Sequence, residues 1–304
     1  ALAHGAHTIT GGLGGLGVRA AALLVARGAS RVLLASRSGR AARGDGRGVE
    51  AALLRAALGG GTAVVRTAAC DGADAADAAA LVGGGPPAGL LHAAGAADAC
   101  LLAAVASRAE RRLFAPKAVG AWLLHGATAA APLEACALFS SVASGLGNVG
   151  QGSYAAANAC LDAHALVRRT RGHVCSALQW PLVGGAGMGA GAFAALAERR
   201  LAIAGFAGIS LEEYAACLGA QLGLRVGGVA QSVQMVHRSD VREVVADLAD
   251  ASQPRFAELA GAATAVCETR SAIASSAVMR QGDEETELAR AVARLPPAQR
   301  LARA

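Results

Sequence analysis

A glycine-rich turn near the start of the chain is the feature that most restricts its fold. The segment TGGLGGLG, residues 10–17, follows a short strand-like segment at 6–10 and precedes a helical pattern at 18–27 that ends at Gly28. A second apolar strand follows at 31–35. Glycines between a strand and a helix let the backbone approach a pyrophosphate, which N–H groups at the helix N-terminus then bind. The sequence therefore predicts a nucleotide-binding βαβ unit.

Strand-like and helical segments continue to alternate along the rest of the chain. Further strands are predicted at 62–68, 88–92, 135–139, 174–180 and 229–236, and helices at 49–58, 153–169, 193–200 and 211–222. Another helix is predicted to carry Lys117 after Pro116. Strands joined through helices pair in parallel, and the helices then cover both faces of the sheet. The sequence therefore predicts the α/β class, with a Rossmann-like, doubly wound parallel sheet. Trp122, Leu123 and Leu124 are expected to form the apolar side of their helix that packs on this sheet.

Composition argues against several classes of function. Hydrophobic residues make up 54% of the chain, but no apolar run reaches the roughly 18 residues of a membrane span, and the N-terminus has no signal pattern. We therefore expect a soluble, intracellular protein, most simply a cytoplasmic one, with no membrane partner. The net charge of +6 comes from dispersed arginines and aromatic residues make up 3%, which argues against nucleic-acid binding. The seven cysteines show no C-x-x-C motif and no nearby histidine pair, so neither a metal site nor a disulfide framework is predicted.

Three segments at the ends of predicted strands are candidates for cofactor binding. The SRS segment at 36–38 stands where an NAD-preferring enzyme usually carries an acidic residue, and a cation with two hydroxyls suits the 2′-phosphate of NADPH. A solvated loop arginine is the alternative. Asp71 either accepts a hydrogen bond from an adenine amine or caps the helix that follows it. In HAAG, residues 92–95, small side chains would let a nicotinamide ribose lie against the backbone, and His92 is interpreted as a hydrogen-bonded strand residue in preference to an acid–base group.

A single lysine and a pair of hydroxyl groups are candidates for catalysis. Lys117 is the only lysine in the chain, although lysine and arginine together number 28. Arginine does not replace a lysine at a catalytic site, so this lysine indicates a function; drift in a skewed composition is the alternative. The segment at 139–158, FSSVASGLGNVGQGSYAAAN, runs from a buried strand through a glycine-rich loop into a helix. Hydroxyls at the strand end and at the helix start would converge on the crevice where parallel sheets bind ligands.

Six motifs follow one another along the chain over about residues 6–260: TGGLGGLG, SRSG, HAAG, FAPKAVGAWLLH, LFSSVASGLGNVGQGSYAAANACLDA and GMG. Together they resemble the ketoreductase domain of modular polyketide synthases, a member of the short-chain dehydrogenase/reductase superfamily. The resemblance implies four catalytic residues: Tyr154 as proton donor, Ser141 as the hydroxyl that holds the ketone oxygen, Lys117 as the cation, and Asn158. Most of the superfamily places lysine four residues after the tyrosine. Here, as in these ketoreductases, the lysine and the asparagine are exchanged.

The resemblance also implies the cofactor and the chemistry. NADPH would deliver hydride to the β-carbon of a β-ketoacyl thioester while Tyr154 and Ser141 hydrogen-bond the developing alkoxide. A free tyrosine has a pKa near 10, so a cation such as Lys117 is needed to stabilise its phenolate, and that lysine would also hold the nicotinamide ribose. The predicted cofactor-binding residues are Thr10, Gly11, Gly12, Leu13, Gly14, Gly15, Leu16, Gly17, Ser36, Arg37, Ser38, Asp71, His92, Ala93, Ala94, Gly95, Lys117 and Tyr154.

The expected partners follow from the same resemblance. The substrate would be a β-ketoacyl chain tethered by phosphopantetheine to an acyl carrier protein, and the product a β-hydroxyacyl thioester made during polyketide chain extension. An upstream structural subdomain and other domains of a multidomain synthase would be further partners. Residues 1–260 are expected to form the catalytic subdomain, and 261–285, which is rich in alanine, serine and threonine and then acidic, a linker. Residues 286–304 resemble the start of an acyl carrier protein; an unrelated C-terminal helix is the alternative.

Two other functions stay open from the sequence. Some members of the family keep the fold and the NADPH pocket but serve as structural or epimerising modules. These usually lack part of the tetrad, which is complete here. The second alternative is a stand-alone short-chain dehydrogenase that acts on a small ketone. The exchanged Lys117 and Asn158 and the carrier-like tail disfavour it.

Overall fold

The computed structural model describes six stretches of the chain, residues 5–41, 63–97, 107–147, 150–185, 208–223 and 232–236. All six lie in the first of the two units into which the chain divides, Ala1–Arg238; the second unit is Ser239–Ala304. Several predicted segments lie outside the described residues: the helices at 49–58 and 193–200, the GMG motif, the linker at 261–285 and the carrier-like segment at 286–304.

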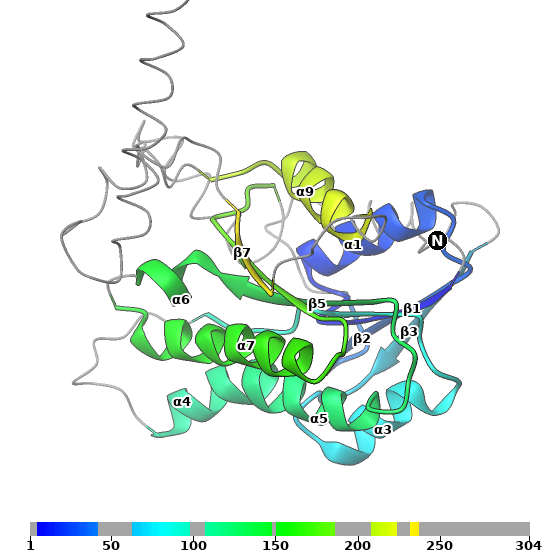
Figure 1. The fold of residues 1–304 in the computed structure, drawn as a ribbon, viewed down its shortest axis with the longest axis horizontal. Helices are drawn as coiled ribbons and strands as arrows, with labels where there is room; N and C mark the ends of the chain where they lie inside the picture. The colour runs from blue at the N-terminus through cyan, green and yellow to red at the C-terminus, as the bar shows by residue number, and fades with distance from the viewer. Residues whose placement is uncertain are drawn as a thin grey trace, which may run out of the picture. The chain divides into compact units, whose positions relative to one another are not determined.

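The described strands form one parallel sheet. Their bounds are β1 Ala6–Thr10, β2 Arg31–Ser36, β3 Val64–Ala69, β4 Gly89–His92, β5 Ala135–Ser141, β6 Ser176–Trp180 and β7 Val233–Met235. They lie in the order β3-β2-β1-β4-β5-β6-β7 (Figure 1). The chain builds outward from β1 to β3 and then crosses back to β4, so the direction of winding reverses between β1 and β4. In open sheets, ligands bind at the carboxyl ends of the strands beside such a reversal.

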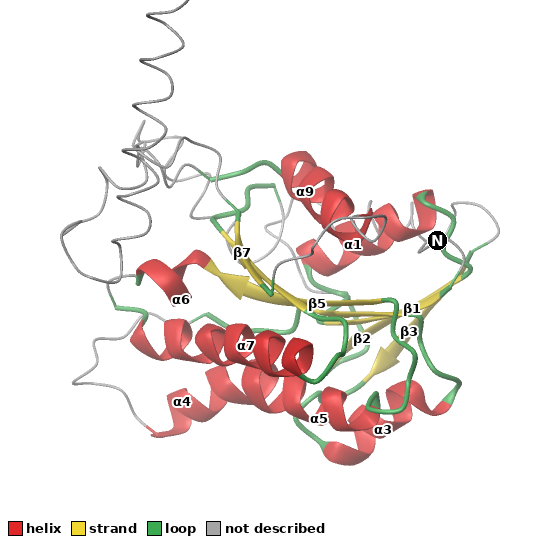
Figure 2. Ribbon diagram, viewed as in Figure 1, coloured by secondary structure: helices red, strands yellow, loops and turns green. Residues whose placement is uncertain are grey.

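Helices cover both faces of this sheet, as the alternating pattern predicts. Their bounds are α1 Gly15–Ala26, α3 Ala75–Gly83, α4 Ser107–Phe114, α5 Gly120–Ala127, α6 Val142–Leu146, α7 Gly152–Thr170 and α9 Leu211–Gly223. A short π-helical turn, η3 Ala115–Val119, joins α4 to α5. α1 and α9 lie on one face of the sheet, and α3, α4, α5 and α7 lie on the other (Figure 2). None of the described helices combines the length and apolarity needed to cross a bilayer.

Two apolar layers hold the helices on the sheet. One includes Ile9, Leu24 and Tyr214 and joins the sheet to α1 and α9. The other includes Leu124 and Leu161 and lies under α5 and α7. β5 reads ACALFSS and is buried along its whole length, as expected of a central strand that is covered on both faces.

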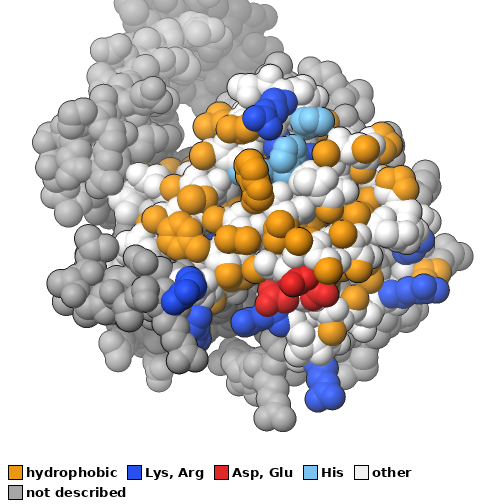
Figure 3. Space-filling view, turned by 90° about the horizontal axis from the view of Figure 1, so that it is seen from below, with side chains coloured by type: hydrophobic (Ala, Val, Ile, Leu, Met, Phe, Trp, Pro, Cys, Tyr) orange, Lys and Arg blue, Asp and Glu red, His pale blue; other side chains and the backbone are white. Residues whose placement is uncertain are grey.

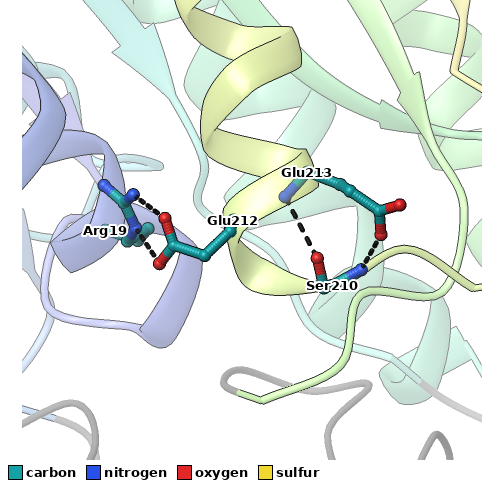
Figure 4. Close-up of polar contacts among 4 residues, drawn as sticks. All are labelled: Arg19, Ser210, Glu212 and Glu213. Carbon is teal, nitrogen blue, oxygen red and sulfur yellow. Dashed lines mark hydrogen bonds and ion pairs between the residues drawn. The ribbon is translucent and has the colours of Figure 1, made fainter.

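Polar contacts fix the start of α9 against α1, the helix that follows the glycine-rich turn. The Arg19 guanidinium of α1 donates to the Glu212 carboxylate, with 2.6 Å between Nη2 and Oε2 (Figure 4). Ser210 and Glu213 form a capping box, in which each backbone N–H donates to the other residue's side chain. A segment far along the chain is thereby held beside the first helix.

The described strands begin and end within two residues of their predicted bounds, apart from β7, whose predicted start lies outside the described residues. One packing prediction is wrong. The exposed fraction of Trp122 is 63%, whereas Leu124 is 1% exposed. Successive residues of a helix are rotated by about 100°, so residues two positions apart point to opposite sides. The buried positions of α5 are Gly120, Ala121 and Leu124, and they leave Trp122 on the outer side.

Candidate active site

The glycine-rich turn lies at the carboxyl end of β1, against the loop that follows β4. Gly11 has a φ of +67°, and a Cβ there would lie 2.5 Å from the backbone nitrogen of Ala94. A Cβ at Gly17 would lie 2.5 Å from the Gly11 carbonyl oxygen. Both positions therefore require glycine, the first for its backbone conformation and both for close approach. The predicted strand, turn and helix are all present.

The N-terminus of α1 is open to an anion. Its N-cap is Gly14, which has no side chain to bond the first N–H groups, and the first turn carries no acidic residue. Unpaired N–H groups and the positive end of a 12-residue helix bind phosphate groups. The turn and the helix start therefore fit the pyrophosphate of a dinucleotide.

The residues proposed for the 2′-phosphate lie where β2 ends. Arg37 is exposed, and the Ser36 hydroxyl is buried without a hydrogen-bond partner. The Ser38 hydroxyl accepts a hydrogen bond from the Arg40 N–H at 3.2 Å and shapes the turn. A free guanidinium beside an unpartnered hydroxyl fits a phosphate group.

Asp71 does not cap the helix that follows it. The N-cap of α3 is Asp74, whose carboxylate accepts hydrogen bonds from the Ala76 and Asp77 N–H groups. Asp71 is exposed, and its carboxylate accepts a hydrogen bond from the Ala73 N–H at 3.1 Å. The capping alternative is therefore wrong, because the helix starts three residues later than that alternative requires. The adenine contact stays a prediction.

His92 ties three parts of the site together. Its Nε2 donates to the Lys117 carbonyl oxygen at 3.0 Å, so its Nδ1 accepts the Thr10 hydroxyl proton, with 2.6 Å between the two atoms. Burial lowers the pKa of His92 to about 4, so the ring is neutral at pH 7. The interpretation of His92 as a hydrogen-bonded strand residue is confirmed. With both ring nitrogens engaged and the residue 0% exposed, its side chain has no hydrogen-bonding group left for a cofactor.

Lys117 is a buried cation beside the tyrosine. It lies in η3, its exposed fraction is 4%, and its Nζ donates to the Phe139 carbonyl oxygen at 2.9 Å. Nζ lies 5.6 Å from the centre of the Tyr154 ring. Burial lowers the pKa of Lys117 to about 8, and the Asp162 carboxylate opposes this shift. The lysine is therefore largely protonated at pH 7 and can stabilise a nearby phenolate.

Tyr154 and Asn158 lie one turn apart on α7, directly after the glycine-rich loop. Tyr154 is half-buried in the first turn, and the fully buried Asn158 donates from Nδ2 to the Tyr154 carbonyl oxygen at 2.8 Å. The Asn158 Oδ1 is buried and has no hydrogen-bond partner among the described residues. Because buried acceptors are usually satisfied, this atom marks a place for a donor from a water or a ligand.

Ser141 is the last residue of β5 and the N-cap of α6. Its hydroxyl oxygen accepts a long hydrogen bond from the Ala143 N–H, at 3.3 Å, which leaves the hydroxyl proton available to a substrate oxygen. The preceding Ser140 hydroxyl donates to the Asn158 carbonyl oxygen at 3.3 Å. Three consecutive residues of β5 therefore hold Lys117, anchor α7 and present the hydroxyl predicted to act in catalysis.

A hydrogen-bond network centred on Asp162 supports this site and was not predicted from the sequence. The Asp162 Oδ2 accepts hydrogen bonds from the Ser144 hydroxyl at 2.6 Å and from the Gln179 side-chain amide at 2.8 Å. These contacts join α7, α6 and β6 behind the tetrad. Spacing offered a signal, because Asp162 follows Asn158 by four residues and therefore lies on the same side of α7.

Comparisons with known proteins agree with this geometry. A family model described as "KR domain" matches residues 5–185. A spectinabilin polyketide synthase system protein, NorB of Streptomyces orinoci, is 40% identical over 223 residues, which are 72% of this chain and 10% of that protein. The pikromycin polyketide synthase component PikAIII of Streptomyces venezuelae is 40% identical over 201 residues, 65% of this chain and 12% of that protein.

Solved structures resemble the chain in the same way. The first ketoreductase of the tylosin PKS superposes with a TM-score of 0.67 at 35% identity, over 84% of this chain and 55% of that one. An A1-type ketoreductase gives a TM-score of 0.69 at 32% identity, over 85% of this chain and 54% of that one. The chain therefore spans about half the length of these structures and about a tenth of the two synthase proteins.

Proposed function

Because the chain belongs to the ketoreductase (KR) domain family of modular polyketide synthases, we propose that it reduces a β-ketoacyl thioester to a β-hydroxyacyl thioester with NADPH. The observation that carries the proposal is the pairing of a buried, protonated Lys117 with Tyr154, with Nζ 5.6 Å from the ring centre. A buried cation costs stability, and its position beside a phenol is what catalysis by tyrosine requires.

The glycine-rich turn, the start of α1 and the end of β2 would hold the cofactor. Gly11 and Gly17 let the backbone approach the pyrophosphate, and Arg37 with Ser36 would bind the 2′-phosphate. When bound, NADPH supplies the hydride that reduces the ketone carbon. Lys117, close to Gly95 in the loop after β4, would hold the nicotinamide ribose.

Tyr154 and Ser141 would act on the ketone oxygen. Their hydroxyls would donate hydrogen bonds to the oxygen as negative charge develops on it, and the tyrosine would then transfer its proton. Lys117 stabilises the resulting phenolate by its charge. Asn158, with its free buried Oδ1, would accept a hydrogen bond from a group that restores the tyrosine's proton.

We further propose a carrier-bound substrate and a multidomain setting. The curated relatives are large polyketide synthase proteins, of which the chain matches a small part. In such a setting an acyl carrier protein would bring the β-ketoacyl chain on phosphopantetheine, and an upstream structural subdomain would adjoin residues 1–260. Residues 261–285 would then be a linker, and 286–304 the start of a carrier domain.

The proposal is tested by Tyr154→Phe. Reduction of a short β-ketoacyl thioester, followed by NADPH absorbance, should fall about 10³-fold or more because the proton donor is lost. NADPH binding, measured by fluorescence titration, should stay nearly unchanged. Tyr214→Phe is the matched control: it removes a buried hydroxyl that donates to the Leu16 carbonyl, so it should cost about 1 kcal/mol of stability and spare the reaction.

Each result of this experiment has a clear meaning. Comparable turnover in Tyr154→Phe would remove the tyrosine from the mechanism. A wild type that binds NADPH but reduces nothing would favour the structural or epimerising module. Turnover of untethered small ketones in preference to thioesters would favour a stand-alone dehydrogenase.

The cofactor assignment is tested by Arg37→Glu. A carboxylate beside the 2′-phosphate repels it, so the ratio of kcat/KM for NADPH to that for NADH should fall by about 100-fold. Arg31→Glu is the control, because Arg31 is exposed at the opposite end of β2. An unchanged preference in Arg37→Glu would disprove the phosphate contact.

A further inference from the structure

We propose that α5 and the last turn of α7 form a second anion-binding site, in which Arg168 and the neighbouring histidines bind one carboxylate or phosphate group. The site is separate from the candidate active site. Tyr154 lies in the first turn of α7 and Arg168 in the last, which places them about 21 Å apart along the helix axis.

The first observation is a buried guanidinium without an anion. Arg168 is 2% exposed, its Nη1 donates to the His125 Nδ1 at 2.7 Å, and its Nε is buried with no hydrogen-bond partner. Within the described part of the chain, no carboxylate pairs with it. Arginine stays protonated at all accessible pH values, so it cannot lose this charge as a buried lysine can. Buried arginines are nearly always paired, and among the described residues this one has no counter-ion.

The second observation is the group of imidazoles around it. The His125 ring centre lies 5.2 Å from that of His164 and 5.9 Å from that of His173. Because the His125 Nδ1 accepts from Arg168, its proton lies on Nε2, which is a donor. The space-filling view shows histidines grouped beside a basic side chain and next to a hydrophobic surface (Figure 3). This cluster offers donors and positive charge, and it lacks negative charge of its own.

The described charges that act on His125 and His164 are all positive or neutral. The pKa of His164 is lowered to about 4, chiefly by burial. Electrostatic repulsion by His125, Arg168 and Arg171 adds to this shift. Burial and then Arg168 lower the pKa of His125. On the sheet side, the charge of Arg168 favours the ionised forms of the Cys136 and Cys175 thiols, and so acts to lower the pKa of each. A bound anion would offset the charge of the arginines, would raise the pKa of the neighbouring histidines and would therefore be accompanied by proton uptake.

A metal ion is not the ligand that fits. Within the described ranges, no group of three His, Cys, Asp or Glu side chains is arranged to hold a metal. A metal would also repel the adjacent guanidinium, whereas a carboxylate or phosphate accepts hydrogen bonds from it in a forked geometry. The carboxylate or phosphate can belong to a small anion in solution or to an acidic side chain of an adjoining protein segment. In the second case the segment would also contact Trp122, which is exposed beside the cluster.

The test is an NMR titration of the histidine ring protons with inorganic phosphate, at constant ionic strength and with saturating NADPH so that the cofactor site is filled. Phosphate should raise the pKa of the cluster histidines by about 0.5 or more. The shift should vanish in Arg168→Gln and persist in Arg112→Gln, which removes an exposed arginine of α4. Chloride at equal ionic strength should give no shift.

Two outcomes would overturn the proposal: no shift in the wild type, or the same shift in Arg168→Gln. If Arg168→Gln does not fold, His173→Asn serves instead, and it should weaken the phosphate response at least several-fold. A longer synthase polypeptide that includes the adjoining domains distinguishes the sources. Loss of the phosphate response there identifies a protein carboxylate as the occupant, and its persistence identifies a free anion.

Discussion

Two buried cations in the same layer of helices have different surroundings, and the difference separates the candidate active site from the opposite end of α7. Lys117 is 4% exposed and donates to a backbone carbonyl beside Tyr154; Arg168 is 2% exposed and donates to a neutral imidazole. Both are costly to bury. Their charged neighbours differ. The Asp162 carboxylate raises the pKa of Lys117 and so favours its charged form, whereas the groups near Arg168 are histidines and arginines.

The comparison shows why each site uses its own residue type. A lysine with a pKa of about 8 is charged at pH 7 and still close to releasing its proton, so its charge can respond to a phenol that gains and loses a proton. Arginine cannot respond in this way. Its charge is permanent, so it suits the recognition of an anion, and a buried arginine is costly unless an anion pairs with it.

The largest effect is expected from Lys117→Met. Reduction should fall about 10³-fold, because the phenolate loses its stabilising charge. The free energy of unfolding at pH 7 should stay level or rise, because the variant no longer buries a cation. Thioester reduction assays and urea unfolding measure the two quantities. A loss of more than about 2 kcal/mol of stability would mean that the lysine is chiefly structural.

The next effect is a pH dependence of the free energy of unfolding that arises from Lys117. Its pKa is about 8 in the folded chain against 10.5 for the free group, so folding disfavours the protonated form. Below pH 8 the folded state carries the whole penalty. Between pH 8 and 10.5 the unfolded chain binds more protons than the folded one, so stability rises with pH, by about 3 kcal/mol at most.

Urea unfolding of wild type and Lys117→Met across pH 7 to 10 isolates this contribution. The difference in unfolding free energy between them should shift in favour of the wild type as the pH rises. The comparison is needed because buried thiols such as Cys70, whose pKa is raised to about 11, contribute in the opposite direction. A pH-independent difference would contradict the assignment.

The smallest effects are expected from a pair of glycines, one that contacts Lys117 and one that follows His125 in the chain. A Cβ at Gly95 would lie 2.8 Å from the Lys117 Cε and must displace that side chain, so Gly95→Ala should lower kcat about tenfold. Gly126, which follows His125 in α5, has open space at its Cβ position. Gly126→Ala should therefore stabilise the domain by up to about 1 kcal/mol without affecting kcat. Equal effects of the two substitutions would show that Gly95 does not set the lysine's position.

Much of the fold could be predicted because its signals are local. The alternation of strands and helices placed β1 at 6–10 in prediction and structure alike, and the glycines between β1 and α1 indicated the turn. The packing of Trp122 was predicted wrongly, and the structure excludes capping of α3 as one of the two alternatives for Asp71. The first depends on the rotation of α5 about its axis and the second on the residue at which α3 begins, and neither an apolar tripeptide nor a single aspartate specifies these.

The sequence by itself determined the class of fold, the order of the motifs and the residues of the proposed tetrad, since each is encoded in a short segment of chain. Only the tertiary structure decided which charges meet. Lys117 lies against Phe139 and Tyr154, and Arg168 against His125, through contacts between segments 22 to 43 residues apart. The reason is physical: a charge's pKa and its need for a partner depend on burial and on neighbours, which exist only once the helices have packed on the sheet.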